Sequence, residues 1–103
     1  MAELATIARP YAEALFQAER SDLSAAQDWL DALAAVAADG QLLEFAADPR
    51  VDAQQVFQLV SGLLPKALPE RGANFLRVVI DNERLAALPE VARQFRALTS
   101  SVT

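Results

Sequence analysis

Carboxylates are the main candidates for chemistry in this sequence. Asp28 and Asp31 lie one helical turn apart, a spacing that could pair them for acid–base work or for coordinating a metal ion. The chain has no His and no Cys, so it lacks the usual general base, a thiolate nucleophile and the common zinc ligands. Gly40, Gly62 and Gly72 are isolated, so they form no phosphate-binding loop. Because the two aspartates stand in an Ala-rich stretch, we interpret them as solvated and expect no enzyme, no cofactor and no metal site.

The charge distribution argues against nucleic acid as a partner. The net charge is −5, and the acidic excess lies in the first half of the chain, while basic residues are scattered through the second. Binding to nucleic acid normally needs clustered positive charge.

Charged residues follow Met1 closely, and the longest uncharged stretch, 53–65, is too short to span a bilayer. We therefore expect a cytosolic chain that does not insert directly into a membrane.

The composition predicts an all-α fold. Ala and Leu, both strong helix formers, dominate the chain, and Val78-Val79-Ile80 is its only β-branched run. Five prolines and three glycines divide the sequence into short helical segments with short connections, which is typical of a compact six-helix bundle. At 103 residues we expect one helical domain spanning 1–103.

Local signals place the boundaries of these helices. Asp52 with Gln55 three residues later forms a capping-box pattern, and Gly40 suits a left-handed helix end. In the last helix, Val91, Ala92, Phe95 and Leu98 form the apolar face. The first expected helix covers 4–20, the second runs from a cap at Ser21 or Ser24 to 39–40, and the third covers 41–48. The fourth runs from Asp52 to Pro65, the fifth from Pro69 or Glu70 to about Asn82, and the sixth from Pro89 onward.

Pro10 leaves two interpretations of the first helix open. If the helix begins at Ile7 or later, Pro10 lies in the first turn, where its missing N–H is not needed. If the helix begins at Leu4, Pro10 removes the hydrogen bond to the Thr6 carbonyl and bends the helix.

The first and fifth helices carry more apolar surface than one core requires. Apolar residues cover roughly 200° of the first helix, whereas a surface helix typically needs only a little over ~100°. Either both helices lie in the centre of the bundle, or they lie side by side and leave a shallow apolar groove that accepts a partner helix. The groove hypothesis predicts that it is lined by Ile7, Tyr11, Ala14 and Ala18 from the first helix and by Gly72, Leu76 and Val79 from the fifth.

Glu83 is added to this candidate site because of its angular position. It falls between Val79 and Leu76, in the middle of the apolar arc of the fifth helix. A buried, unpaired carboxylate there would be costly, so we expect this edge to reach solvent or a partner.

Two segments carry a family resemblance. IARPYAEALF near the start and NERLAALPEVARQF near the end resemble the delta subunit of F-type ATP synthases, related to the mitochondrial oligomycin-sensitivity-conferring protein. The resemblance spans essentially the whole chain. The family often has Gly where Glu83 stands, and its full-length members continue into a second domain, so we expect an N-terminal domain whose C-terminal stalk-binding domain is absent.

The resemblance implies a mechanical role without chemistry. A six-helix domain would grip the amphipathic N-terminal helix of an alpha subunit between its first and fifth helices and tie the catalytic head to the peripheral stalk, supporting ATP synthesis coupled to proton transport. Contact with the stalk b subunit would run through the missing domain. The location implied is peripheral, at the cytoplasmic face of the bacterial inner membrane.

The alternative to this stator role is a helical module, unrelated to ATP synthase, that associates with a copy of itself. Self-association would make the chain a dimer, whereas a groove without a partner would leave it a monomer.

Overall fold

The computed structural model describes residues 3–102, and in this range the all-α prediction is confirmed. Six α-helices and one short 3-10 helix, η1, account for its regular structure. Their bounds are α1 (Leu4–Ala18), α2 (Leu23–Ala37), α3 (Gly40–Ala47), α4 (Ala53–Leu63), α5 (Glu70–Asp81), η1 (Leu85–Ala87) and α6 (Leu88–Ser101).

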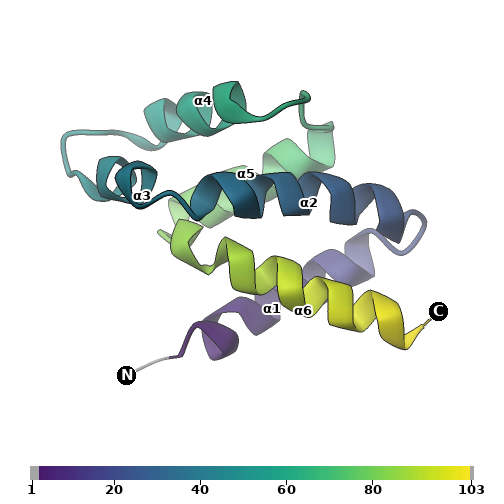
Figure 1. The fold of residues 1–103 in the computed structure, drawn as a ribbon. Helices are drawn as coiled ribbons and strands as arrows, with labels where there is room; N and C mark the ends of the chain where they lie inside the picture. Colours follow the sequence, from purple (N-terminus) through teal and green to yellow (C-terminus); the bar gives the residue numbers. More distant parts are fainter. Residues whose placement is uncertain (1–2, 103) are drawn as a thin grey trace.

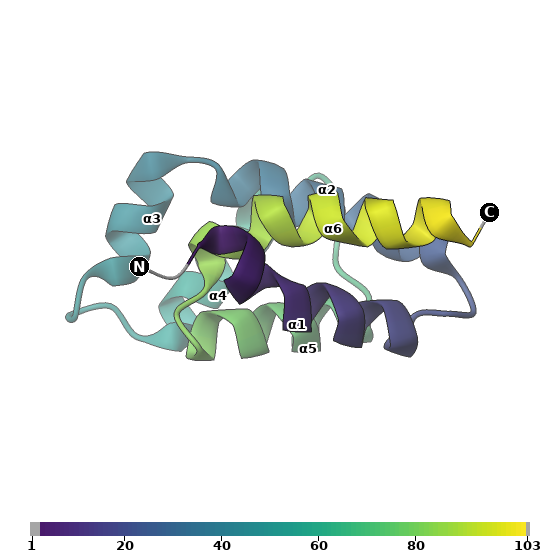
Figure 2. The same cartoon turned by 90° about the horizontal axis from the view of Figure 1, so that it is seen from below.

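Helix α6 is the central element of the bundle. It packs along both α1 and α2, while α4 lies against α5 and the short α3 continues beyond the end of α2 (Figures 1 and 2). Phe95 of α6 is fully buried and meets the Phe16 ring of α1 edge to face, with 6.3 Å between the ring centroids. The predicted apolar face of α6 is confirmed for Val91, Ala92 and Phe95, which are buried, and Leu98 packs against them half-buried.

Aspartates cap α2 and α3. The cap of α2 was predicted at Ser21 or Ser24, which was wrong, and Gly40 was predicted to end that helix. Asp22 caps α2 by accepting a hydrogen bond from the Ala25 N–H at 3.0 Å. Asp39 caps α3, and Gly40 is the first residue of α3. The prediction of a left-handed end at Gly40 was therefore wrong, because the Asp39 carboxylate makes this position a helix start.

The fourth helix begins as its sequence predicts. The Asp52 carboxylate accepts from the Gln55 N–H at 2.8 Å, and the Gln55 side chain accepts from the Asp52 N–H at 2.9 Å. This reciprocal pair satisfies two backbone donors that the first turn of a helix leaves free.

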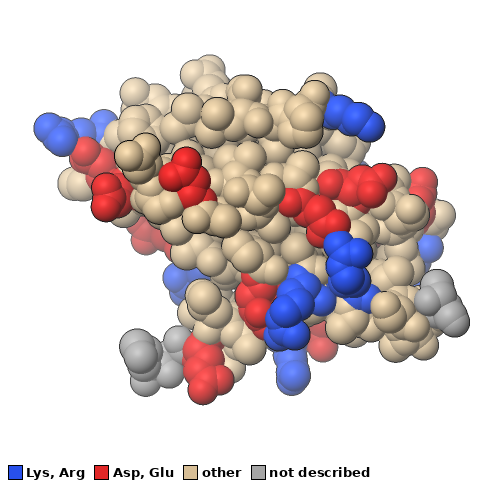
Figure 3. Space-filling model, viewed as in Figure 1, with Lys and Arg blue, Asp and Glu red and all other residues tan. Residues whose placement is uncertain are grey.

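Between Asp52 and Lys66 the sequence has no charge, and Figure 3 shows the resulting uncharged surface along α4.

Pro10 lies inside α1, not in its first turn. The helix begins at Leu4, so Pro10 cannot donate the backbone bond that the Thr6 carbonyl would otherwise accept. Figure 2 shows the axis of α1 changing direction after its first turns, as expected at an internal proline. Of the two interpretations of Pro10, the structure selects the bend.

The end of α5 explains the conformation of Glu83. Among the described residues other than glycine, Glu83 alone has a positive φ, 57°. Its N–H donates to the Ile80 carbonyl at 2.9 Å, and the Arg84 N–H donates to the Val79 carbonyl at 2.9 Å. These two bonds form a Schellman motif, which ends a helix with a residue in the left-handed conformation that Gly adopts most easily.

Candidate functional site

A groove of about 700 Å³ separates α1 from α5 on the surface of the bundle. Its walls are mainly apolar, and its charged and amide side chains lie just after α1, along α5 and at the C-cap of α5. The lining residues are Pro10, Tyr11, Ala14, Leu15, Ala18 and Glu19 from α1 and the residue after it, and Arg71, Asn74, Phe75, Val78 and Asn82 from α5 and its C-cap.

Aromatic contacts form the floor of this groove. The Phe75 ring meets the Tyr11 ring edge to face, with centroids 6.5 Å apart. On its other side Phe75 lies against Trp29 of α2, at 5.8 Å between centroids. Both Phe75 and Tyr11 are half-buried, so these rings are held in place while one edge remains accessible.

Polar contacts join α1 to α5 at each end of the groove. At one end the Asn82 amide donates to the Tyr11 hydroxyl at 2.9 Å. At the other end the Arg71 guanidinium donates to the Ala18 carbonyl at 2.9 Å and forms an ion pair with Glu19 at 3.3 Å. The Arg71–Glu19 pair is exposed on the arginine side, so we assign it to orientation more than to stability.

Val78 is the exposed large aliphatic side chain of the groove. Half of its surface is exposed, in the wall formed by α5. An exposed branched aliphatic residue beside half-buried aromatic rings gains free energy when a second apolar surface covers it. The groove therefore presents an apolar surface that is only partly covered.

The two carboxylates that the sequence places one helical turn apart have different surroundings. Asp28 is exposed, whereas Asp31 accepts a hydrogen bond from Gln27 at 2.7 Å and pairs with Arg96 of α6. Asp31 thus fastens α2 to α6. Residues 3–102 contain no group of three or more acidic, His or Cys side chains placed to hold a metal ion, and none of their helices has the length and apolar character needed to cross a membrane.

Comparison with known proteins establishes the family. The model of the family described as "ATP synthase delta (OSCP) subunit" matches residues 7–102. The chain belongs to this family. It is 57% identical over 101 residues to the ATP synthase subunit delta of Polaromonas sp. (strain JS666 / ATCC BAA-500), covering 98% of this chain and 57% of that protein.

Further relatives carry the same description. The ATP synthase subunit delta of Polaromonas naphthalenivorans is 57% identical over 104 residues, and that of Delftia acidovorans is 55% identical over 103 residues. These matches cover 98% and 97% of this chain and 58% of each relative. The chain thus spans less than two thirds of the length of these delta subunits.

In this delta-family chain, more of the lining residues predicted for α1 than of those predicted for α5 line the groove. Tyr11, Ala14 and Ala18 line the groove as expected from their helical spacing. Ile7 does not line it; it is half-buried and packs against the core.

The α5 wall required a correction. Leu76 and Val79 are 0% and 1% exposed, so they belong to the core. Gly72 is buried beneath Trp29, where an added Cβ would lie 3.2 Å from the indole ring. These three residues occupy the middle of the apolar arc, which faces inward, and the edge of the arc formed by Phe75 and Val78 faces the groove.

Glu83 also lies away from the groove. As the left-handed residue after α5, it borders a separate hollow of about 350 Å³ between the α3–α4 region and η1. A position between Val79 and Leu76 on the helical face would require α5 to continue through Glu83, but α5 ends at Asp81. Glu83 therefore does not share the face of Val79 and Leu76.

Several groove residues escaped the sequence-based assignment for identifiable reasons. Phe75 and Val78 lie at one edge of the apolar arc of α5, and the sequence pattern alone does not show which edge stays uncovered. Asn82 and Arg71 act through partners more than fifty positions away in the sequence, Tyr11 and Ala18. No local signal identifies such contacts.

Proposed function

We propose that this delta-family chain is a non-catalytic stator component of F-type ATP synthase whose groove binds the amphipathic N-terminal helix of an alpha subunit. By holding that helix it links the catalytic head to the peripheral stalk and supports ATP synthesis coupled to proton transport. The observation that carries the proposal is the apolar groove between α1 and α5, with exposed Val78 in its wall, in a chain that belongs to the delta family.

The dimensions of the groove support a helical occupant. From Tyr11 to Ala18, α1 advances about 10.5 Å, which is about the distance between residues i and i+7 of a helix. A partner helix can therefore place apolar anchors at i, i+3 or i+4, and i+7 along this wall. Ala14 and Ala18 are small and exposed, so the backbone of the partner can approach α1 closely.

The polar ends of the groove support a defined position for that helix. An apolar stripe fits over Phe75 and Val78, while the Tyr11–Asn82 and Arg71–Glu19 pairs meet the polar flanks of the partner. Polar groups at the rim of an interface mainly fix register and partner choice.

The proposal places the chain peripherally at the cytoplasmic face of the bacterial inner membrane. Contact with the b subunit of the peripheral stalk would run through the part of the delta subunit that this chain does not span. No direct membrane insertion and no nucleic acid are involved.

Peptide binding tests the groove. The chain is titrated by calorimetry with a synthetic peptide copying the N-terminal amphipathic helix of an alpha subunit. Trp29 contacts Phe75, which lines the groove, so its fluorescence reports the same binding event. Val78→Asp should weaken binding at least about tenfold, since loss of a central anchor typically exceeds ~1.4 kcal/mol. Leu59→Asp is the matched control, because Leu59 is an exposed apolar residue of α4 outside the groove.

Two outcomes would count against the proposal. Equal peptide affinity for Val78→Asp and Leu59→Asp would remove the groove as the binding site. Concentration-dependent sedimentation of the chain without peptide, abolished by Val78→Asp, would assign the groove to self-association instead. Val79→Ala is unsuitable as a binding test, since buried Val79 would report core packing.

A further inference from the structure

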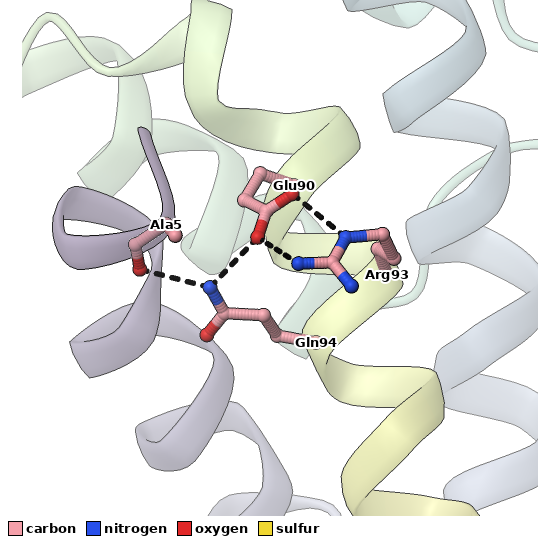
Figure 4. A network of polar contacts seen from close by, with 4 residues as sticks. All are labelled: Ala5, Glu90, Arg93 and Gln94. Carbon is pink, nitrogen blue, oxygen red and sulfur yellow. Dashed lines mark hydrogen bonds and ion pairs between the residues drawn. The ribbon is translucent and has the colours of Figure 1, made fainter. Parts of the chain in front are cut away.

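Gln94 of α6 joins that helix to the first turn of α1. Its side-chain amide donates to the Ala5 carbonyl at 2.8 Å and to the Glu90 carboxylate at 3.0 Å (Figure 4). Both amide hydrogens of Gln94 are therefore engaged. Since Glu90 precedes Gln94 by one turn on α6, the bond between them fixes the direction in which the Gln94 amide points.

Glu90 is itself held as an acceptor. Arg93 donates to it through Nε at 2.9 Å, and a second bond runs from its terminal nitrogen. The bond from Arg93, followed by the bond from Gln94, lowers the pKa of Glu90 from 4.5 to about 2. At neutral pH Glu90 is thus a carboxylate, which accepts hydrogen bonds but cannot donate them.

The first turn of α1 has few other restraints. Its N-cap residue, Glu3, makes no side-chain capping bond, and Leu4, Ala5 and Thr6 are exposed. The missing N–H of Pro10 also removes one backbone bond between this turn and the rest of the helix. Ile7 and Ala8 anchor the later part of the segment before Pro10 in the core, so the exposed first turn is the part that the Gln94 contact with α6 holds.

The segment after Pro10 packs against α6 through Phe16 and Phe95, and it also contacts α5. Tyr11, the next residue, accepts a hydrogen bond from Asn82 at the C-cap of α5. The bend in α1 thus has contacts with α6 on both sides, through Gln94 before it and Phe95 after it, and the contact of Tyr11 with α5 follows it directly. Pro10 itself lines the groove between α1 and α5.

We infer that Gln94 is a positioning residue for the groove: by holding the Ala5 carbonyl it fixes the bend at Pro10 and so sets the end of the groove formed by Pro10, Tyr11 and Asn82. Gln94 does not line the groove, so this action is indirect. Its effect on partner affinity rests on the proposed function, whereas its effect on the Tyr11–Asn82 contact does not.

Gln94→Met tests this inference because Met has a similar length but donates no hydrogen bond. Gln58→Met, at an exposed glutamine of α4, is the matched control, and Gln94→Lys restores a donor. The readouts are the NMR resonance of the Asn82 side-chain amide, hydrogen exchange at residues 5–9, and affinity for the alpha-subunit peptide.

For Gln94→Met we expect a shifted Asn82 resonance, faster exchange at residues 5–9 and about three- to tenfold weaker peptide binding, the range set by one net hydrogen bond. Gln94→Lys should reverse these changes in part. If Gln94→Met lowers only the stability of the fold, with an Asn82 resonance and a peptide affinity equal to those of Gln58→Met, the inference is overturned.

The two proposals fail in different ways. If the unmodified chain does not bind the peptide, the proposed function fails, and the Asn82 resonance still decides whether Gln94 positions the groove. If the unmodified chain binds and Gln94→Met binds equally well with an unchanged Asn82 resonance, the groove function stands and the role of Gln94 is refuted.

Discussion

Replacing Glu83 with Gly should stabilise this domain. With φ at 57°, Glu83 occupies the left-handed region, which costs a residue with a Cβ about 1–2 kcal/mol. Gly avoids that cost but loses about 0.5–1 kcal/mol through its greater freedom in the unfolded chain. The expected net gain is about 0.5–1 kcal/mol, because the two bonds of the Schellman motif are backbone bonds and stay in place.

The magnitude is large enough to measure by thermal unfolding. A gain of 1 kcal/mol raises the melting temperature of a domain of this size by about 4–8 °C, so we expect an increase of about 2–8 °C. Circular dichroism during heating, together with urea unfolding, measures both quantities. The slope of the urea transition should not change, since no additional surface becomes buried.

Two control variants isolate the backbone conformation as the cause. Glu83→Ala removes the carboxylate but keeps the Cβ, so it should not reproduce the gain, and Glu83→Asn should lie between Ala and Gly. Equal stability of the Gly and Ala variants would refute the conformational explanation. None of these variants should change peptide affinity, and a large loss would return Glu83 to the binding site that the sequence first suggested.

Two further predictions concern other positions. Gly72→Ala should destabilise the domain by about 1 kcal/mol in urea unfolding and shift Trp29 fluorescence, since crowding of the indole at 3.2 Å outweighs the gain in helix propensity; increased stability would show that Trp29 yields easily. Because the pKa of Glu90 is lowered from 4.5 to about 2, mainly by Arg93, its contribution to stability is complete above pH 4.5 and is lost as the pH falls toward 2. Acid titration of Glu90→Gln should therefore show a smaller loss of stability in this window, and an unchanged titration would contradict the assignment.

Features encoded by neighbouring residues were predictable from the sequence. The capping box of Asp52 and Gln55, the end of α3 before Pro49 and the buried face of α6 all depend on side chains within one or two turns. Such signals act before the chain has packed, so periodicity and capping rules detect them. The same rules wrongly predicted a helix end at Gly40. Asp39, one residue before it, instead caps the start of α3, and a Gly beside an Asp is compatible with either a helix end or a helix start.

The groove was predictable as an excess of apolar surface but not as a set of residues. The apolar arc of α5 is wider than the core can cover, and which edge stays uncovered depends on how α5 is rotated against α2 and α4. Trp29 packs over Gly72 on the side of α5 where Val79 is buried, whereas Val78 is exposed. The Trp29–Gly72 contact joins residues more than forty positions apart, and a helical wheel contains no such contact.

The beginning of α1 shows the same limit at a single residue. From the sequence, a start at Ile7 and a start at Leu4 were both compatible with Pro10, and Glu3 supplies no side-chain cap that would favour the earlier one. In the folded chain, the Gln94 amide holds the Ala5 carbonyl within the first turn. A contact with α6 therefore supports the first turn, which makes Pro10 an internal residue, so the bend beside the groove depends on tertiary packing as well as on the proline itself.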